Sequence, residues 1–308
     1  MNTAFSFLLC VAIWGSTWYA IKFQLGSVPT EWAVAYRFAI AAAVLLAFCA
    51  ASGRRLRFPL RDHALFAGLG ALLFSINYAF TYWSTAYLTS GLVAVVFSMM
   101  SLINQVNGAI FLRQPLEGRV LLAAVAGLAG LGLIFRPELA VFDPSGDVVR
   151  GVGLCLLATL FASFGNTLAA GSRARALPLF AFNGYAMLYG AALMALLALA
   201  GGKAPAFDFR APFVLSLLYL ALAGSVLAFS LYLTLIKTIG LGRSGYVAVL
   251  IPLVALAIST LFEGYRWTAS GVLGVALVLL GNMLLLRRRG PATEAKAKAA
   301  AARKSGVA

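Results

Sequence analysis

The sequence predicts an all-α polytopic membrane protein with ten transmembrane helices, arranged as two inverted five-helix repeats. Hydrophobic residues make up 62% of the chain and charged ones 11%, with a mean hydropathy of +0.95, whereas soluble domains are about half apolar and a quarter charged. Apolar stretches of ~20 residues recur, each long enough to cross ~30 Å of hydrocarbon. The hexapeptide SGLVAV at 90–95 also recurs as SGYVAV at 244–249, 154 residues later.

The predicted spans lie at 4–22, 32–51, 64–83, 91–112, 119–135, 150–170, 179–200, 212–234, 243–262 and 268–286. Five spans per half is an odd number, so the second half enters the membrane from the opposite side, as in inverted-repeat transporters. We therefore expect a first five-helix repeat at 1–136, an external linker at 137–147, a second inverted repeat at 148–290 and a disordered basic cytoplasmic tail at 291–308.

The Lys and Arg residues predict the orientation. With the N-terminus inside, 17 of them lie in cytoplasmic segments and the tail, and six lie on the external side. The positive-inside rule then places both termini in the cytoplasm. The net charge of +15 follows from this distribution and does not indicate nucleic-acid binding.

The ninth span contains Pro252 at mid-depth. A proline inside a helix removes a backbone donor and kinks the helix, and the carbonyls that it frees are tolerated only against protein or a wet cavity. We therefore expect a conformational hinge at Pro252. The fifth and tenth spans are Gly-rich and nearly without polar groups, which suits close helix packing in a scaffold.

The ordered motifs resemble EamA-type members of the drug/metabolite transporter superfamily over about residues 1–290. The first span reads WGSTWYAIK at 14–22, an Arg stands in the second span at Arg37, and Pro252 and Glu263 stand in and after the ninth. The resemblance implies an inner-membrane exporter of amino acids, other metabolites or drugs, most like the amino-acid exporter branch.

The chain departs from the family pattern in its first half. The family's proline would fall near Ser98, and Arg113 stands where an acidic residue is usual. These departures leave open whether the first half keeps a helix break without the proline.

Polar and aromatic side chains within the spans are the candidate substrate-binding residues, because polar groups in hydrocarbon usually face the bundle interior. The third span is the richest: Ser75, Tyr78, Tyr82 and Thr85 share one helix face, and Asn77, Thr81 and Trp83 lie around it. These groups could instead only bond helices together, at ~1 kcal/mol each. Their density favours the lining of a cavity.

Other spans add further candidates. They are Trp14 and Thr17 on the first span; Ser98, Ser101, Asn104 and Gln105 on the fourth; Ser163 and Asn166 on the sixth; and Ser225, Phe229 and Tyr232 on the eighth. Trp18 shares the face of Trp14 and could belong to an interfacial aromatic belt. For the second-half residues, helix packing is the alternative.

Charged residues near the outer ends are expected to be structural. Arg37 lies about 8 Å inside its span at 1.5 Å per residue, where it can snorkel outward or pair with Glu31. We expect that pair in preference to binding of a substrate carboxylate. Lys22 and Glu263 are expected to be anchors at the outer interface.

No Asp or Glu lies at mid-depth in any predicted span. Proton-driven carriers usually place a titratable group there, so we expect weakly coupled or uncoupled transport by rocking of the two halves. A cavity without such a counter-charge favours neutral zwitterions with apolar or aromatic side chains, whose ammonium groups aromatic rings can cradle.

Other functional classes have less support. An enzyme would need a nucleophile, metal ligands or paired carboxylates, a channel would show a charged or carbonyl-lined filter, and a receptor or scaffold would carry no flux. Cys10, Cys49 and Cys155 lack metal-ligand spacing. We expect no metal or cofactor, no partner besides a small-molecule substrate and the lipid bilayer, and a monomer. An exporter of drugs or lipophilic cations with the same fold is the main alternative.

Overall fold

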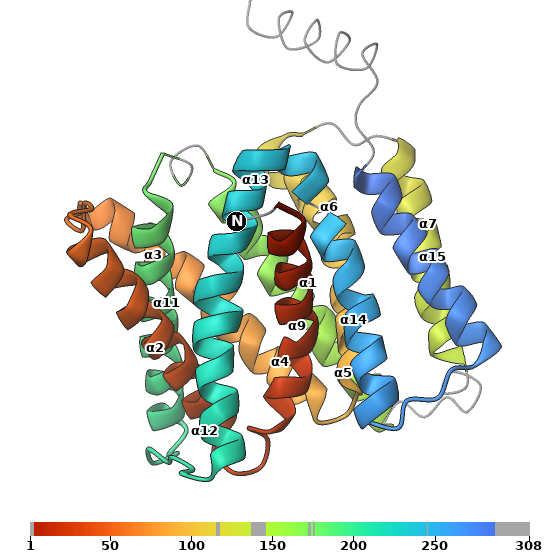
Figure 1. Cartoon of the computed structure of the whole chain (residues 1–308), viewed down its shortest axis with the longest axis horizontal. Helices are drawn as coiled ribbons and strands as arrows, with labels where there is room; N and C mark the ends of the chain where they lie inside the picture. Colours follow the sequence, from red (N-terminus) through yellow and green to blue (C-terminus); the bar gives the residue numbers. More distant parts are fainter. Residues whose placement is uncertain are drawn as a thin grey trace, which may run out of the picture.

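The computed structural model describes residues 3–114, 118–136, 146–171, 174, 176–244 and 246–286, and within these ranges every regular element is a helix (Figure 1). Helices follow from the composition, because a segment in hydrocarbon must satisfy its own backbone polar groups. The predicted linker at 137–147, apart from its last two residues, and the predicted tail at 291–308 lie outside the described residues.

The first half contains α1 (Thr3–Lys22), α2 (Thr30–Ala51), α3 (Leu60–Ala71), the π-helical η1 (Leu72–Ile76), α4 (Asn77–Thr85), α5 (Ser90–Phe97), α6 (Met100–Leu112) and α7 (Gly118–Ile134). The second half contains α9 (Asp147–Ala169), α11 (Leu179–Ala200), α12 (Ala211–Leu218), the π-helical η2 (Tyr219–Leu227), α13 (Ala228–Ser244), α14 (Tyr246–Phe262) and α15 (Ala269–Leu286). In both halves the third predicted span consists of a helix, a π-helical segment and a second helix.

The all-α polytopic fold is confirmed. In the described part of the chain, seven helical stretches are long and apolar enough to cross a membrane, and α7, α14 and α15 are shorter apolar helices. Together they occupy the ten predicted ranges, although the number of crossings and the inverted relation of the halves remain predictions. One boundary was wrong: α13 continues to Ser244, so the stretch 235–242, expected as a loop, is helical.

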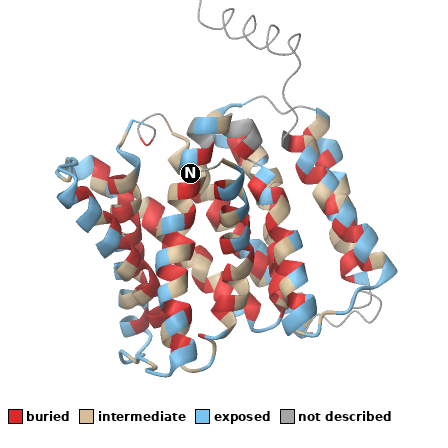
Figure 2. Cartoon of the chain, viewed as in Figure 1, coloured by how far each residue is buried: buried red, intermediate tan, exposed pale blue. Residues whose placement is uncertain are grey.

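Helix packing divides the molecule into a main body and a side pair. In the body, α2 packs against α11, and α1 packs against α14 and α13. The pair α7 and α15 lies side by side at one edge (Figure 1). Buried residues lie on the faces that helices turn toward one another, and exposed residues lie on the outer faces (Figure 2).

Small residues bring α7 and α15 together. A Cβ added to Gly130 would lie 2.6 Å from the Gly274 carbonyl oxygen, and one added to Gly274 would lie 2.5 Å from the Gly130 oxygen. Such close approach lets backbones make van der Waals contact where no hydrophobic effect drives association. The contact is consistent with the scaffold expected for these two spans.

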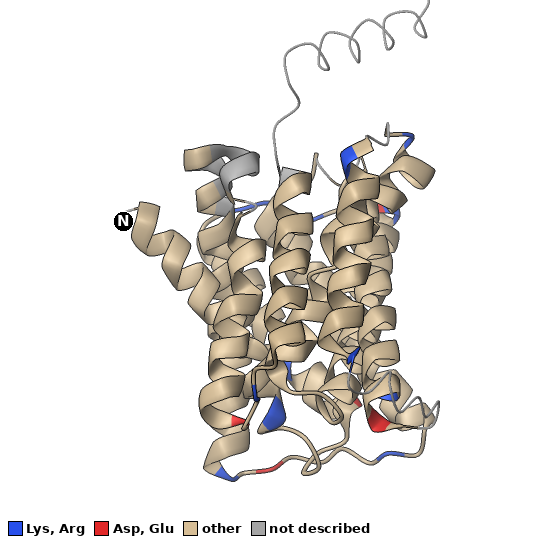
Figure 3. Ribbon diagram, turned by 90° about the vertical axis from the view of Figure 1, so that its right-hand side faces the viewer, with Lys and Arg blue, Asp and Glu red and all other residues tan. Residues whose placement is uncertain are grey.

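Charged side chains gather at the two ends of the helices, and the region between is almost free of them (Figure 3). The described acidic residues lie in the first turn of a helix or outside a helix: Glu31, Asp62, Asp147, Asp208 and Glu263. Arg37, the eighth residue of α2, is buried within a span.

The fourth span, in the first half, contains a helix break although it lacks the proline that the ninth span has at Pro252. Ser98 and Met99 separate α5 from α6, whereas α14 continues without interruption through Pro252. The Ser98 hydroxyl donates to the Val95 carbonyl oxygen at 2.6 Å and accepts from Asn282 Nδ2 of α15 at 3.2 Å. A side chain that bonds the preceding turn competes with the backbone ladder, so the break needs no proline.

Candidate substrate-binding site

In each half, one predicted site residue is a serine in the π-helical segment of the third span. Ser75 of η1 donates to the Ala71 carbonyl oxygen at 2.8 Å, and Ser225 of η2 donates to the Leu220 oxygen at 2.9 Å. A π-helical turn displaces the backbone hydrogen bonds from their α-helical partners, and such turns occur often at functional sites. Sequence reasoning identified both serines but missed the π-helical backbone.

The second π-helical segment anchors an aromatic group composed of Trp14, Phe229 and Tyr232. Trp14 Nε1 donates to the Gly224 carbonyl oxygen in η2 at 3.1 Å. The Trp14 ring lies 5.3 Å from the Phe229 ring, and also 5.3 Å from the Tyr232 ring, measured between centroids. All three side chains are half-buried. The structure therefore brings together three predicted site residues from the first and eighth spans.

The expected pairing of Arg37 with Glu31 is wrong. Glu31 Oε1 lies 2.7 Å from Lys203 Nζ, while Arg37 Nε donates to Ser225 Oγ at 3.3 Å. The physical reason is helical spacing: residues three or four apart share a helix face, whereas these two are six apart and project to different sides.

Arg37 instead lies against aromatic rings. Its guanidinium carbon is 4.6 Å from the centroid of the Tyr78 ring and 5.2 Å from that of Phe38. The residue is 2% exposed. Cation–π attraction is strongest where water is excluded, so the rings stabilise the charge within the span.

The predicted stripe on the third span is mostly packed into the protein. Ser75, Tyr82 and Thr85 are buried, and Tyr78 is half-buried. Tyr82 donates to Gln24 Oε1 at 2.7 Å, and Thr85 donates to the Tyr82 carbonyl oxygen at 2.7 Å. The side chains of the stripe are thus more buried than those of an open cavity wall would be, and Tyr82 bonds a residue outside its own span.

The neighbours of the stripe have different surroundings. Asn77 and Thr81 are buried, and the Thr81 hydroxyl donates to the Asn77 carbonyl oxygen at 2.9 Å. Trp83 is 39% exposed and contacts Phe80. Thr17, on α1, is buried and donates to the Trp14 carbonyl oxygen at 2.7 Å.

A second polar group joins α6 to α9. Asn107 Nδ2 donates to Ser163 Oγ at 2.8 Å, and Asn166 Nδ2 lies 3.4 Å from Asn104 Oδ1. Ser101 and Gln105 are half-buried on the same helix. Asn107 was not predicted as a site residue, although its i,i+3 spacing from Asn104 was a usable signal.

The two parts of the fourth span differ in exposure. In α5 every residue from 90 to 96 is buried except Leu92, whereas in α6 none of the residues from 101 to 106 is buried. Six consecutive residues cover more than one full helical turn, so no face of α6 is fully buried along this stretch. The bundle is therefore closed around α5 and looser around α6.

At the closed end, Glu263 joins three helices. Glu263 Oε1 lies 2.7 Å from Lys22 Nζ at the end of α1. The backbone amide of Ser90, the first residue of α5, lies 2.9 Å from Glu263 Oε2. The hydroxyls of Ser90 and Ser259 also donate to this carboxylate. We call these four residues, Lys22, Ser90, Ser259 and Glu263, the outer latch, after the side of the membrane on which the Lys and Arg distribution predicts them.

The charge of Glu263 suits this position. A carboxylate at a helix N-terminus is stabilised by the helix dipole and the free amides. Burial raises the pKa of Glu263, but the Lys22 ammonium and the hydroxyls of Ser259 and Ser90 more than offset this, so the pKa lies below its ordinary value. The group is therefore ionised at neutral pH.

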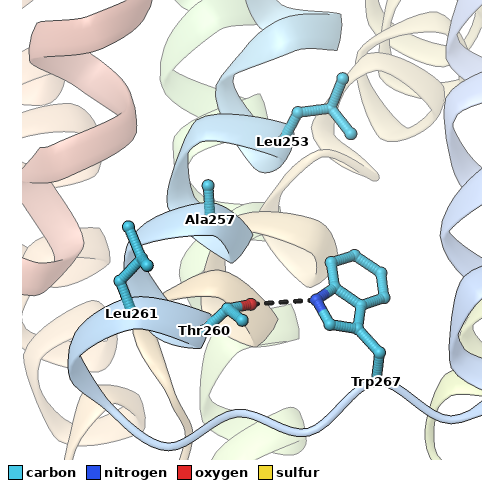
Figure 4. Close-up of a pocket in the computed structure, with 5 residues that line it drawn as sticks. All are labelled: Leu253, Ala257, Thr260, Leu261 and Trp267. Carbon is cyan, nitrogen blue, oxygen red and sulfur yellow. Dashed lines mark hydrogen bonds between the residues drawn. The ribbon is translucent and has the colours of Figure 1, made fainter.

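A pocket of about 340 Å³ lies elsewhere, on α14 and the segment that follows it (Figure 4). Its lining is mostly apolar and contains none of the predicted site residues: Leu253, Ala257, Thr260, Leu261 and Trp267. Trp267 Nε1 donates to Thr260 Oγ1 at 3.0 Å (Figure 4). We do not assign the substrate to it.

Comparisons with known proteins agree with this architecture. The model of the EamA-like transporter family matches residues 1–136 and 149–287. The uncharacterized inner membrane transporter YedA of Escherichia coli K12 is 30% identical in an alignment that covers 88% of this chain and 89% of YedA. Protein PecM of Dickeya dadantii is 26% identical over 72% of this chain and 74% of its own.

A solved crystal structure has the same fold. It superposes with a TM-score of 0.64 at 18% identity, over 92% of this chain and 95% of its own. At this identity the likeness shows the fold alone. The family match spans nearly the whole chain, and the protein is therefore a membrane transporter of the EamA-like family.

Proposed function

We propose that the protein exports neutral amino acids with apolar or aromatic side chains, or similar small metabolites, across the bacterial inner membrane. The observation that carries this proposal is the aromatic group of Trp14 on α1 with Phe229 and Tyr232 on α13, which Trp14 connects to η2 by a hydrogen bond. Aromatic faces cover an apolar side chain and attract an ammonium group. Family membership supports transport of a small molecule.

The difference between α5 and α6 supports alternating access. With both termini in the cytoplasm, as the Lys and Arg distribution predicts, the outer latch lies on the external side and α6 on the cytoplasmic side. A state closed outside and open inside is the state in which an exporter loads its substrate. Rocking of the two repeats would then expose the substrate to the outside.

The positions of the carboxylates support weak or absent ion coupling. The described acidic residues lie in first turns or outside helices, whereas proton carriers usually hold a titratable group at mid-depth. The buried positive charge of Arg37 also disfavours a lipophilic cation, the main alternative cargo, because like charges repel strongly in a low dielectric.

Counterflow in proteoliposomes tests the proposal. Vesicles preloaded with unlabelled phenylalanine, methionine or threonine should accumulate the labelled amino acid, and an imposed pH gradient should change the rate little. If folded protein exchanges no amino acid but takes up tetraphenylphosphonium, the cargo is a lipophilic cation and the proposal is wrong. A strong stimulation by the pH gradient would contradict the uncoupled mechanism.

A further inference from the structure

Two buried hydrogen-bond donors close to the Tyr82 hydroxyl lack acceptors among the described residues. They are Arg37 Nη1 and Gln24 Nε2. The three residues are almost inaccessible, with exposed fractions of 2% for Arg37, 1% for Gln24 and 0% for Tyr82. A buried donor without a partner is unfavourable. An added acceptor would therefore stabilise this group of residues.

The two donors border the same small region. The Tyr82 hydroxyl donates to Gln24 Oε1 at 2.7 Å, which places the Nε2 of the same amide beside that hydroxyl. The Tyr82 side chain also interacts with the guanidinium of Arg37. An acceptor placed next to Tyr82 would therefore lie close to both residues.

The charge of this region is positive and has no described counter-ion. Glu31, the acidic residue nearest in sequence, is paired with Lys203. The rings of Tyr78 and Phe38 stabilise the cation, but they offer no acceptor in the plane of the guanidinium. Ser225 Oγ accepts from Nε of this guanidinium but is neutral. A buried charge without an opposite charge is costly, so the acceptor that fits best is an anion.

We propose that Arg37, Gln24 and Tyr82 form the binding site for the carboxylate of the transported substrate. This inference rests on the proposed function and specifies it. The two unpaired donors of Arg37 and Gln24 match the two oxygens of a carboxylate in number, and hydrogen bonds between charged partners are the strong ones. Binding would complete the hydrogen bonding of both side chains.

The backbone of η2 connects this carboxylate site to the aromatic group. Ser225 Oγ accepts from Arg37 Nε, and the carbonyl of the preceding residue, Gly224, accepts from Trp14 Nε1. Adjacent residues of one π-helical segment thus contact the cation and the aromatic group. In the proposed site an amino acid would place its carboxylate at Arg37 and its side chain against Trp14.

Binding of four phenyl compounds to the purified protein tests the site without relying on transport. The compounds are L-phenylalanine, 3-phenylpropionate, L-phenylalaninamide and phenethylamine, and the readout is thermal stabilisation in a low-salt zwitterionic buffer without chloride or sulfate. We expect the first two, which carry the carboxylate, to bind at least about tenfold more tightly than the last two, the loss typical of a charge-assisted hydrogen bond.

Substitutions in the site should reduce this discrimination. Arg37→Met should bind phenylalanine and phenylalaninamide alike, whereas Tyr82→Phe and Arg37→Lys, which keep a positive charge in the site, should retain part of the difference. Arg54→Met is the matched control, because Arg54 also stacks on two rings, Phe48 at 4.9 Å and Phe180 at 4.8 Å, but is exposed. If Arg37→Met does not fold, Tyr82→Phe and Gln24→Leu carry the test.

Three outcomes would overturn the proposal. Equal binding of phenylalanine and phenylalaninamide, with counterflow of phenylalanine intact, would remove the carboxylate site and leave the proposed function standing. If sodium chloride alone stabilises the wild type but not Arg37→Met, the site binds an inorganic anion instead of the substrate carboxylate. Absence of both binding and counterflow for every amino acid would remove the site and the proposed function together.

Discussion

The Nζ atom of Lys22 lies 2.7 Å from Oε1 of Glu263. This contact joins the end of α1 to the residue after α14, and the same carboxylate accepts from the first amide of α5. The Glu263 side chain is 6% exposed and that of Lys22 30%, so the carboxylate is more shielded than in a surface ion pair. Three helices that are distant in the sequence are thereby held together at one end of the bundle.

Replacing Glu263 by Gln should loosen that end. The substitution removes the ion pair and weakens the cap on α5, which is worth about 1 kcal/mol, or about fivefold in an equilibrium. The measurement is modification of a Val95→Cys probe by an impermeant thiol reagent added outside, after the buried Cys10, Cys49 and Cys155 are replaced by Ser. We expect the rate to rise at least about fivefold.

Asp208→Asn is the control for this experiment. Asp208 pairs with Arg210 at 2.7 Å in an exposed loop, so its loss removes a charge without touching the outer latch. Labelling that stays at the wild-type rate in Glu263→Gln, or that rises equally in Asp208→Asn, would show that the latch does not hold α5 closed.

The outer latch should not respond to pH in the physiological range. The pKa of Glu263 lies below its ordinary value of 4.5, so its stabilising interactions are fully present above that value and are lost only as the pH falls through the lower one. The ratio of counterflow rates between wild type and Glu263→Gln should therefore be constant from about pH 6 to 8. A ratio that changes severalfold over this interval would refute the assignment.

Gly130→Ala should destabilise the pair of α7 and α15. The added methyl group would lie 2.6 Å from a backbone oxygen of Gly274, and overpacking of this kind costs about 1–3 kcal/mol. Thermal unfolding in detergent measures the effect. Gly132→Ala is the matched control on the same helix, since nothing lies within 4 Å of its added Cβ; equal stability of the two variants would contradict the close approach.

Trp14→Phe should slow counterflow about fivefold or more. The change keeps an aromatic ring but leaves the Gly224 carbonyl of η2 without the indole donor, at a cost of about 1–3 kcal/mol for an unsatisfied group. Trp83→Phe is the comparison, because Trp83 is exposed and contacts only the neighbouring Phe80 among the described rings. A larger effect of Trp83→Phe would place the transport path on the other side of the third span.

Sequence reasoning located the helices well because their signal is local. A stretch such as residues 179–200 is apolar at nearly every position and carries no charge, and α11 occupies those residues. The end of the eighth span was harder to predict. The helix α13 continues ten residues past the predicted boundary at 234, and these residues are less apolar than those before them. Polarity marks where a span leaves hydrocarbon, but a helix can continue in water.

The partners of polar side chains were harder to predict. Tyr82 was identified from its helix face, but its partner Gln24 lies 58 residues away in the segment after α1. Asn282 was missed, although it bonds Ser98 at the helix break, because its span has almost no other polar group. Each of these contacts depends on which helices become neighbours, and no local pattern reports that.

By itself the sequence determined the membrane class, the positions of the helices and the residue types available for a site, since hydropathy and helical periodicity are properties of consecutive residues. Only the tertiary structure decided that Arg37 lies on Tyr78 and beside Ser225 instead of with Glu31. It also decided that Glu263 closes on Lys22 and Ser90. The physical reason is that ion pairs and hydrogen bonds act over about 3 Å, and folding alone brings distant residues that close.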